Sequence, residues 1–263
     1  TVLTTINLGA GSHPGTVGVD ASTNQVFVVQ GNTAAADDTV AVIDGTPGTL
    51  TENTVVTTIP VSGRYLAGAG SMAVNPTTHR VYIPSFDPGG QVIVIDGSSN
   101  TLLSPISVAA NPVSAAYDSG HDRIYVGHGA FFGRGELTMI DAATHAVSNG
   151  PTVGLAQSDL GVNAGTHTLY VHKGDPSRGS AYEIVVVDTT TNTVTTTIPG
   201  GASSYGGVGI DSTKAFIYVA DSNSDNVRVI DGVSGSPTLH TILGTVAVGD
   251  QPGFYNSYWV DTG

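Results

Sequence analysis

The segment IVVVDTTTNTVTTTI, residues 184–198, combines an apolar run, an aspartate, a short polar turn and a second run rich in Thr and Val. Val, Ile and Thr are β-branched and fit pleated strands better than helices. The same order of elements recurs along the chain, and each apolar run ends in an aspartate. These aspartates are Asp44, Asp96, Asp141, Asp188 and Asp231, separated by 52, 45, 47 and 43 residues. A period of this length is typical of a four-stranded propeller blade.

Each repeat contains four predicted strands, which we call a to d from the axis to the rim. Strand a ends in Asp or Asn, as in Val17-Gly18-Val19-Asp20, and strand b carries an aromatic residue, as in Val81-Tyr82-Ile83. Strand c leads into the repeated aspartate, and strand d is rich in Thr, as in Val55-Val56-Thr57-Thr58-Ile59. Strands b and c are continuous apolar runs, as expected where neighbouring blades cover both faces of a strand. Thr in strand d suits a rim strand that contacts water.

The turns between these strands follow local rules. Asp or Asn opens each a–b turn, where its side chain can bond backbone groups two residues on. Asp-Gly opens three of the c–d turns, and we expect the Gly to supply a positive φ. Five histidines are assigned structural positions: His79, His121 and His167 at one shared position of the a–b turn, His145 in a c–d turn, and His240 in a rim strand.

The sequence therefore predicts an all-β protein, a β-propeller of four-stranded antiparallel blades with five full repeats and part of a sixth. We expect one domain over residues 1–263, with an incomplete last blade after Asp261. The partial repeat consists of a d strand at Val2 to Leu8 and an a strand at Tyr255 to Val260. An inner and an outer strand cannot pair directly, because two strand spacings of roughly 4.8 Å would be missing between them. We expect either that the natural polypeptide continues beyond Gly263 or that a neighbouring chain donates strands.

Three segments resemble a known family of repeats. They are Asn75-Pro76-Thr77-Thr78-His79-Arg80-Val81-Tyr82-Ile83, Val94-Ile95-Asp96-Gly97-Ser98-Ser99-Asn100-Thr101 and Asp188-Thr189-Thr190-Thr191-Asn192-Thr193-Val194. They resemble the YVTN-type β-propeller repeats of surface-layer-like and other exported prokaryotic proteins. The resemblance extends over nearly the whole chain. It implies the propeller fold strongly and function only weakly, because propellers serve in binding, scaffolding and catalysis.

Composition narrows the function classes. The net charge of −13 makes nucleic acid an unfavourable partner, and no apolar run approaches the roughly 20 residues that span a bilayer. The absence of cysteine excludes disulfides, thiolate metal sites and a Cys nucleophile. The scarcity of lysine, with abundant Thr, Ser, Gly and Asn, indicates an exported prokaryotic protein that is extracellular or on the cell surface.

Candidate binding residues lie in the longer and more varied loops. The b–c and d–a loops fall on one side of the predicted ring, which we call the loop face, and the a–b and c–d turns fall on the other, the turn face. Loops carried on a rigid scaffold are common binding sites, and Tyr and Arg are frequent at binding hot spots. The predicted binding residues are Arg64, Tyr65, His128, Phe131, Phe132, Arg134, His172, Lys173 and Tyr205.

One position on this face repeats in every blade. A polar residue follows strand b in all five repeats: Gln30, Ser85, His128, Lys173 and Asp221. These side chains either ring the mouth of the channel or simply mark strand ends that meet water. Only one of the five is a histidine, which argues against a symmetric metal ring. Metal binding by His13, His128 and His172 would need ligands from distant blades, so we expect neither a metal nor a cofactor.

Two function hypotheses remain open. The first is a non-catalytic exported binding or structural module in an extracellular assembly, whose partner is another protein, a copy of itself, a small molecule or a glycan. The second is a loop-face enzyme, lyase- or lactonase-like, that acts on a small molecule with or without the help of a metal. No nucleophile elbow, phosphate-binding loop or zinc-protease motif is present. We therefore assign no catalytic residue and favour the first hypothesis.

Overall fold

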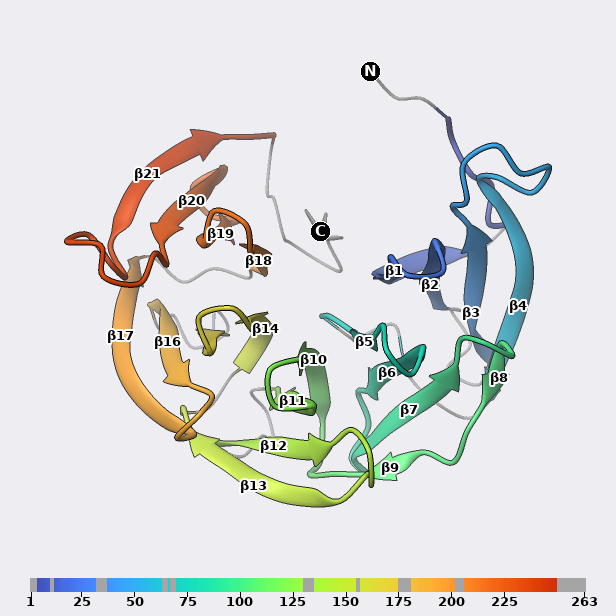
Figure 1. Ribbon diagram of the computed structural model, residues 1–263, viewed down its shortest axis with the longest axis horizontal. Coiled ribbons are helices and arrows are strands. Elements are labelled where there is room, and N and C mark those ends of the chain that lie inside the picture. The colour runs from blue at the N-terminus through green and yellow to red at the C-terminus, as the bar shows by residue number, and fades with distance from the viewer. Residues whose placement is uncertain are drawn as a thin grey trace.

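The computed structural model describes residues 4–9, 12–31, 37–62, 66, 70–129, 135–154, 157–174, 181–201 and 206–249. These residues form five antiparallel sheets arranged around a central axis (Figure 1). We number the sheets as blades: blade 1 is β1–β4, blade 2 is β5–β9, blade 3 is β10–β13, blade 4 is β14–β17 and blade 5 is β18–β21. The described residues contain no helix, and hence none able to cross a membrane. The all-β propeller fold is confirmed.

Strand order within the blades follows chain order, from the axis to the rim. The inner strands are β1 (His13–Asp20), β5 (Ala73–Asn75), β10 (Pro112–Asp118), β14 (Gln157–Asn163) and β18 (Val208–Asp211). The second strands are β2 (Gln25–Gly31), β6 (Arg80–Ser85), β11 (Arg123–His128), β15 (Thr168–Lys173) and β19 (Phe216–Asp221). The third strands are β3 (Asp37–Asp44), β7 (Gln91–Asp96), β12 (Glu136–Asp141), β16 (Tyr182–Asp188) and β20 (Asn226–Asp231). The outer strands are β4 (Thr54–Ser62), β8 (Thr101–Leu102) with β9 (Ile106–Ser107), β13 (Val147–Thr152), β17 (Thr193–Gly201) and β21 (Ile242–Ala247).

The outer strand of blade 2 is divided into two short pieces, β8 and β9, which both pair with β7. Pro105 lies between them, and proline has no N–H to donate to a ladder. An outer strand tolerates this interruption because its far edge has no partner strand in the blade.

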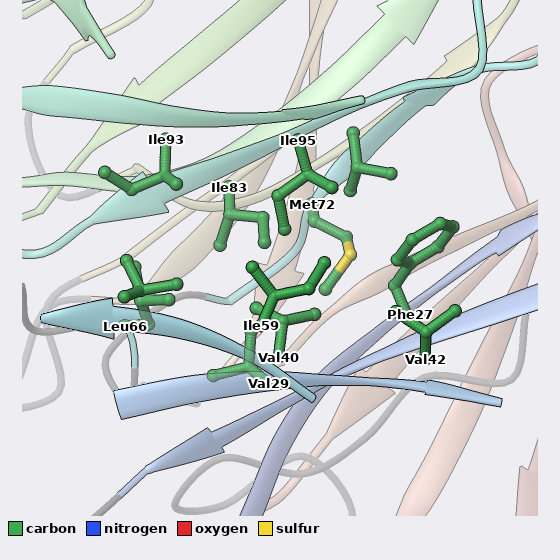
Figure 2. Close-up of a cluster of buried hydrophobic side chains, with 12 residues drawn as sticks. Phe27, Val29, Val40, Val42, Ile59, Leu66, Met72, Ile83, Ile93 and Ile95 are labelled. Carbon is green, nitrogen blue, oxygen red and sulfur yellow. The ribbon is translucent and has the colours of Figure 1, made fainter. Parts of the chain in front are cut away.

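The hydrophobic core lies between the blades. Figure 2 shows the cluster between blades 1 and 2, where Phe27 and Val40 pack against Met72, Ile83 and Ile95. Three similar clusters fill the other contacts between consecutive blades. Each fully buried aliphatic or aromatic side chain contributes about 1.5–3 kcal/mol relative to an exposed one, so these layers supply most of the stability. In blades 2, 3 and 4 the second and third strands are mainly apolar on both faces because a blade lies on either side.

The predicted aspartate turns are present in all five blades. In every a–b turn the Asp or Asn Oδ1 accepts the N–H two residues on, as in Ser22 N to Asp20 at 3.0 Å. The c–d turns repeat this bond, as in Thr46 N to Asp44 at 2.8 Å. The positive φ predicted for the following glycine is wrong, since Gly45, Gly97 and Gly232 lack it. A Cβ on Gly97 would instead lie 2.7 Å from the His79 carbonyl oxygen, so close approach to the a–b turn favours Gly there.

Positive φ values occur at the last residue of each turn, and several histidines occupy that position. In the a–b turns these residues are Asn24, His79, Asp122, His167 and Ala215, and in the c–d turns they are Asn53, Asn100, His145, Asn192 and His240. His121 precedes this position by one residue, and His240 lies in a turn before β21, so both sequence assignments are corrected. Asn, Asp and His enter the left-handed region more readily than most residues.

The five described blades leave the ring open between blade 5 and blade 1 (Figure 1). Of the predicted sixth repeat, residues 4–9 form no strand, and Ile6 and Leu8 pack against Val28, Ala41 and Ile43 on the open side of blade 1. The predicted inner strand at Tyr255 to Val260 lies outside the described residues. The structure therefore shows five blades and not the partial sixth.

Candidate functional site

The second strand of each blade carries a polar residue at its loop-face end, as the last residue in blades 2 to 5 and the last but one in blade 1, and these five residues are structurally equivalent. They are Gln30, Ser85, His128, Lys173 and Asp221. All except Lys173 are buried. Four of the five side chains are therefore not presented to a water-filled mouth, and they are not strand ends that simply meet water.

Each of the five side chains bonds within its own blade. Gln30 Oε1 accepts from Thr39, Ser85 donates to Asp87 at 2.7 Å, and His128 bonds Thr138 at 2.9 Å. Lys173 Nζ lies 2.8 Å from Glu183 Oε2, and Arg228 donates to Asp221 at 2.8 Å. We call these five contacts the latches. They tie the loop-face end of the second strand to the third strand or to the loop leading into it, which gives the loops above them a rigid base.

His128 is fully buried and both of its ring nitrogens are engaged. Nδ1 lies 3.1 Å from the Ala110 carbonyl oxygen, which only accepts, so Nδ1 carries the proton. Nε2 therefore accepts from the Thr138 hydroxyl at 2.9 Å. The backbone N–H donates to Gln157 Oε1 of blade 4 at 2.8 Å. His128 thus stabilises the contact between blades 3 and 4, and it has no free lone pair for a metal ion.

His172 lies one residue before its blade's latch position and is also buried. The Ser158 hydroxyl lies 2.6 Å from Nδ1, and the ring stacks on Tyr182 with centroids 4.9 Å apart. Burial lowers the pKa of His172 to about 4, so the imidazole is neutral near pH 7. Nε2 is buried and has no hydrogen-bond partner among the described residues.

A charged pair of blade 5 meets this part of blade 4. The Asp221 carboxylate accepts from Arg228 at 2.8 Å and from the Tyr182 hydroxyl at 3.4 Å. The Arg228 guanidinium carbon lies 5.5 Å from the centre of the Tyr182 ring, within cation–π range. We call Ser158, His172, Tyr182, Asp221 and Arg228 the blade 4–5 polar cluster. It brings the predicted residue His172 together with polar groups of both blades.

Lys173 directly follows His172 in β15, so its side chain points to the opposite face of the sheet. Its partner Glu183 is directly opposite in the β15–β16 ladder. The lysine and glutamate side chains are 27% and 41% exposed, so solvent screens their attraction. Of the predicted binding residues that the structure describes, Lys173 alone is accessible to a partner.

Asp159 is a polar residue of this region that the sequence did not single out. It lies at the loop-face end of the inner strand β14 and is buried, and its Oδ2 accepts the Val208 N–H at 2.8 Å. Burial raises its pKa to about 6, although bonds from the Ser71 hydroxyl and the backbone oppose this. The sequence does contain a signal for Asp159. It stands four residues before the Asn that ends its inner strand, and the equivalent residues of blades 1 to 3 are Thr16, Ser71 and Ser114, which carry no charge.

The remaining predicted binding residues, Arg64, Tyr65, Phe131, Phe132, Arg134 and Tyr205, lie outside the described residues. Within the described ranges no three His, Asp or Glu side chains converge in a way that could hold a metal ion. His128 and His172 belong to different blade contacts, so the structure does not bring them together at one site.

The fold is common among solved structures. In all, 1311 chains of solved structures resemble it. One of them is Kuenenia stuttgartiensis hydrazine synthase, with a TM-score of 0.63, 12% sequence identity, and coverage of 96% of this chain and 92% of that one. At this identity the likeness shows the propeller fold alone.

No protein-family model matches the sequence, and no curated protein does. The resemblance to YVTN-type repeats therefore rests on the repeat residues themselves and stays a prediction. The shared fold does not identify what the protein binds.

Proposed function

We propose that this propeller is a non-catalytic binding or structural module of an exported, cell-surface or extracellular assembly. The observation that carries the proposal is the set of latches. Polar groups at the base of the loop face bond to one another instead of facing a cavity, so they act as a scaffold for the loops. In this proposal the varied loops contact the partner through Arg64, Tyr65, Phe131, Phe132, Arg134 and Tyr205.

Charge and composition support the choice of partner and location. With a net charge of −13, the chain attracts cationic surfaces, repels nucleic acid and has no net attraction or repulsion for neutral surfaces. The proposed partner is another protein, a copy of the same chain or a neutral glycan. The scarcity of lysine among many Thr, Ser, Gly and Asn residues supports export from a prokaryotic cell.

The two lysines of the chain provide a direct test, because Lys173 lies on the loop face and Lys214 on the turn face. The protein is isolated from its source in the assembled state, acylated with an amine-reactive ester and analysed by mass spectrometry. We expect Lys173 to react several-fold more slowly in the assembly than in the dissociated protein, and Lys214 to react equally in both. Equal reactivity of Lys173 in both states, or recovery of the protein from the cytosol, would contradict the proposal.

A matched pair of variants distinguishes specific loop contacts from nonspecific hydrophobic association. Phe131→Ala with Phe132→Ala removes two apolar loop side chains, and Leu50→Ala removes a fully exposed leucine from a c–d turn. We expect the loop variant to lose assembly and the Leu50 variant to keep it. Loss of assembly in both, or in neither, argues against a loop-face contact.

The second candidate, a loop-face enzyme acting on a small molecule, is favoured by the adjacent Ser158, Asp159 and His172. A neutral histidine 2.6 Å from a serine hydroxyl can accept its proton, and a carboxyl group with a pKa near 6 can donate or accept one near neutral pH. Turnover of a panel of lactones, with and without divalent metals, tests this candidate. Hydrolysis that Ser158→Ala abolishes would establish the enzyme, and rates equal to buffer would exclude it for this substrate class.

A further inference from the structure

Consecutive inner strands share a recurring contact in which a small residue of one blade receives two apolar residues of the next. A Cβ built on Gly18 would lie 2.5 Å from Met72 Sδ and 3.0 Å from Val74. A Cβ on Gly161 would lie 2.8 Å from Val208 and 2.9 Å from Ile210. We call the space over such a residue a socket. The alternation of side chains along a strand explains why its two occupants are two residues apart.

The other two blade contacts follow the same pattern with alanine. Ala73 packs in one cluster with Ala115 and Tyr117, and Ala116 packs in another with Leu160 and Val162. In every case the second occupant directly precedes the Asp or Asn that ends the inner strand. The occupants are therefore identified by their distance from that residue.

The socket of blade 5 has no occupant among the described residues. Gly209 is the equivalent residue, and the only atom within 4 Å of its hypothetical Cβ is Tyr218 Cβ, at 3.9 Å in the same blade. The tyrosines of the second strands show the same difference between blade 5 and the blades before it. Tyr125 donates to Asn192 of the next blade at 2.7 Å, and Tyr170 packs edge-on against His240 of the next blade. Tyr218 has no comparable partner in the described part of the chain.

The sequence contains a segment with the spacing that this socket requires. Val260 directly precedes Asp261, and Tyr258 stands two residues before Val260. Ile210 and Val208 stand at the same distances before Asp211. We propose that residues 255–261 dock on blade 5 as a further inner strand, with Tyr258 and Val260 filling the socket over Gly209.

The substitution Gly209→Val tests the proposal, because the two possible states of the socket predict opposite results. If the socket is filled, the valine side chain competes with Tyr258 and Val260, and the thermal midpoint falls by several degrees. If the socket is empty, valine is tolerated or raises the midpoint, since β-branched residues favour strands. Gly161→Val, in a filled socket, is the destabilised control. Gly244→Val, at an open position of β21, is the tolerated control.

Trp259 is the only tryptophan in the chain and gives a second readout that does not depend on a variant folding. In the unmodified protein we expect its emission to be blue-shifted relative to the urea-unfolded protein and to resist quenching by acrylamide. Amide exchange in β18 should be faster in Tyr258→Ala with Val260→Ala than in the unmodified protein. The proposal is overturned if Gly209→Val matches Gly244→Val and Trp259 emits as in the unfolded chain.

Discussion

The turn face and the loop face are connected by the same four strands in each blade, but they differ in how their polar residues are used. On the turn face one bond, from an Asp or Asn Oδ1 to the N–H two residues on, is repeated in all ten turns of the five blades. On the loop face one position carries five different residues, and each makes a different latch. The difference shows that the residues within a turn determine its conformation, whereas the contact that each latch residue makes depends on residues of other strands.

The largest effect is expected from breaking the buried latch of blade 5. Asp221→Ala leaves the Arg228 guanidinium, which is 19% exposed, without its carboxylate. Removing one member of a buried pair costs about 3 kcal/mol or more, and the Tyr182 hydroxyl loses an acceptor as well. Urea unfolding should show this loss, while Asp221→Asn, which keeps the shape, should lose less. Equal stability of Asp221→Ala and the unmodified protein would show that the latch is not stabilising.

A second large effect is expected on the pH dependence of stability, where two buried groups make opposite contributions that cancel in the unmodified protein. Asp159 has its pKa raised to about 6, so its contribution is present below the unfolded-state pKa near 4 and is lost as pH rises through 6. His172 has its pKa lowered to about 4, so its contribution is present above pH 6.5 and is lost as pH falls through 4. Each shift corresponds to about 3 kcal/mol, and the two oppose each other over the same range.

Single substitutions separate these two contributions. Asp159→Asn should make the protein lose stability as pH falls from 6.5 to 4, and His172→Gln should make it lose stability as pH rises from 4 to 6. Urea midpoints measured at half-unit pH steps test both slopes. Identical pH profiles for the two variants would show that neither group titrates as its burial implies.

A smaller effect is expected on the turn face. Asp20 accepts from the Ser22 N–H at 3.0 Å and from His79 Nδ1 of blade 2 at 2.8 Å. Asp20→Ala should cost about 0.5–1.5 kcal/mol for each hydrogen bond lost, and Asp20→Asn should recover the turn bond but not the charge. Bonds from Ser22 and His79 hold the pKa of Asp20 below its usual range against burial. This contribution is therefore present above pH 4 and is lost at lower pH, which thermal melts at pH 3 and 6 can detect.

The smallest effect is expected from the exposed latch of blade 4. Glu183→Ala removes a pair whose members are both partly exposed, which contributes about 0–1 kcal/mol. Urea unfolding in low and high salt should show a small difference that salt removes. A loss of stability as large as that of Asp221→Ala would show that the free energy contributed by a latch does not depend on its burial.

The turns and strands could be predicted from sequence because their causes are local. A β-branched run sets each strand, and the Asp or Asn at its end sets the turn, so the order of the strands and the five full repeats were correct. The latches could not be predicted in the same way. His128, Lys173 and Asp221 are recognisable as equivalent, but whether each is buried and what it bonds depends on the third strand and the neighbouring blade. Asp159 was missed because the sequence predicts that the inner strand of blade 4 begins at Leu160, whereas β14 begins at Gln157.

Amide hydrogen exchange of the isolated protein tests most directly whether the loop face has a rigid, internally bonded base. The measurement compares the five latch residues with the interiors of the same strands, β2, β6, β11, β15 and β19. The account predicts that the latch amides are protected nearly as well as the strand interiors in the absence of any partner. Rapid exchange at the latch residues beside protected interiors would contradict it, because open strand ends of that kind would be free to bind a ligand.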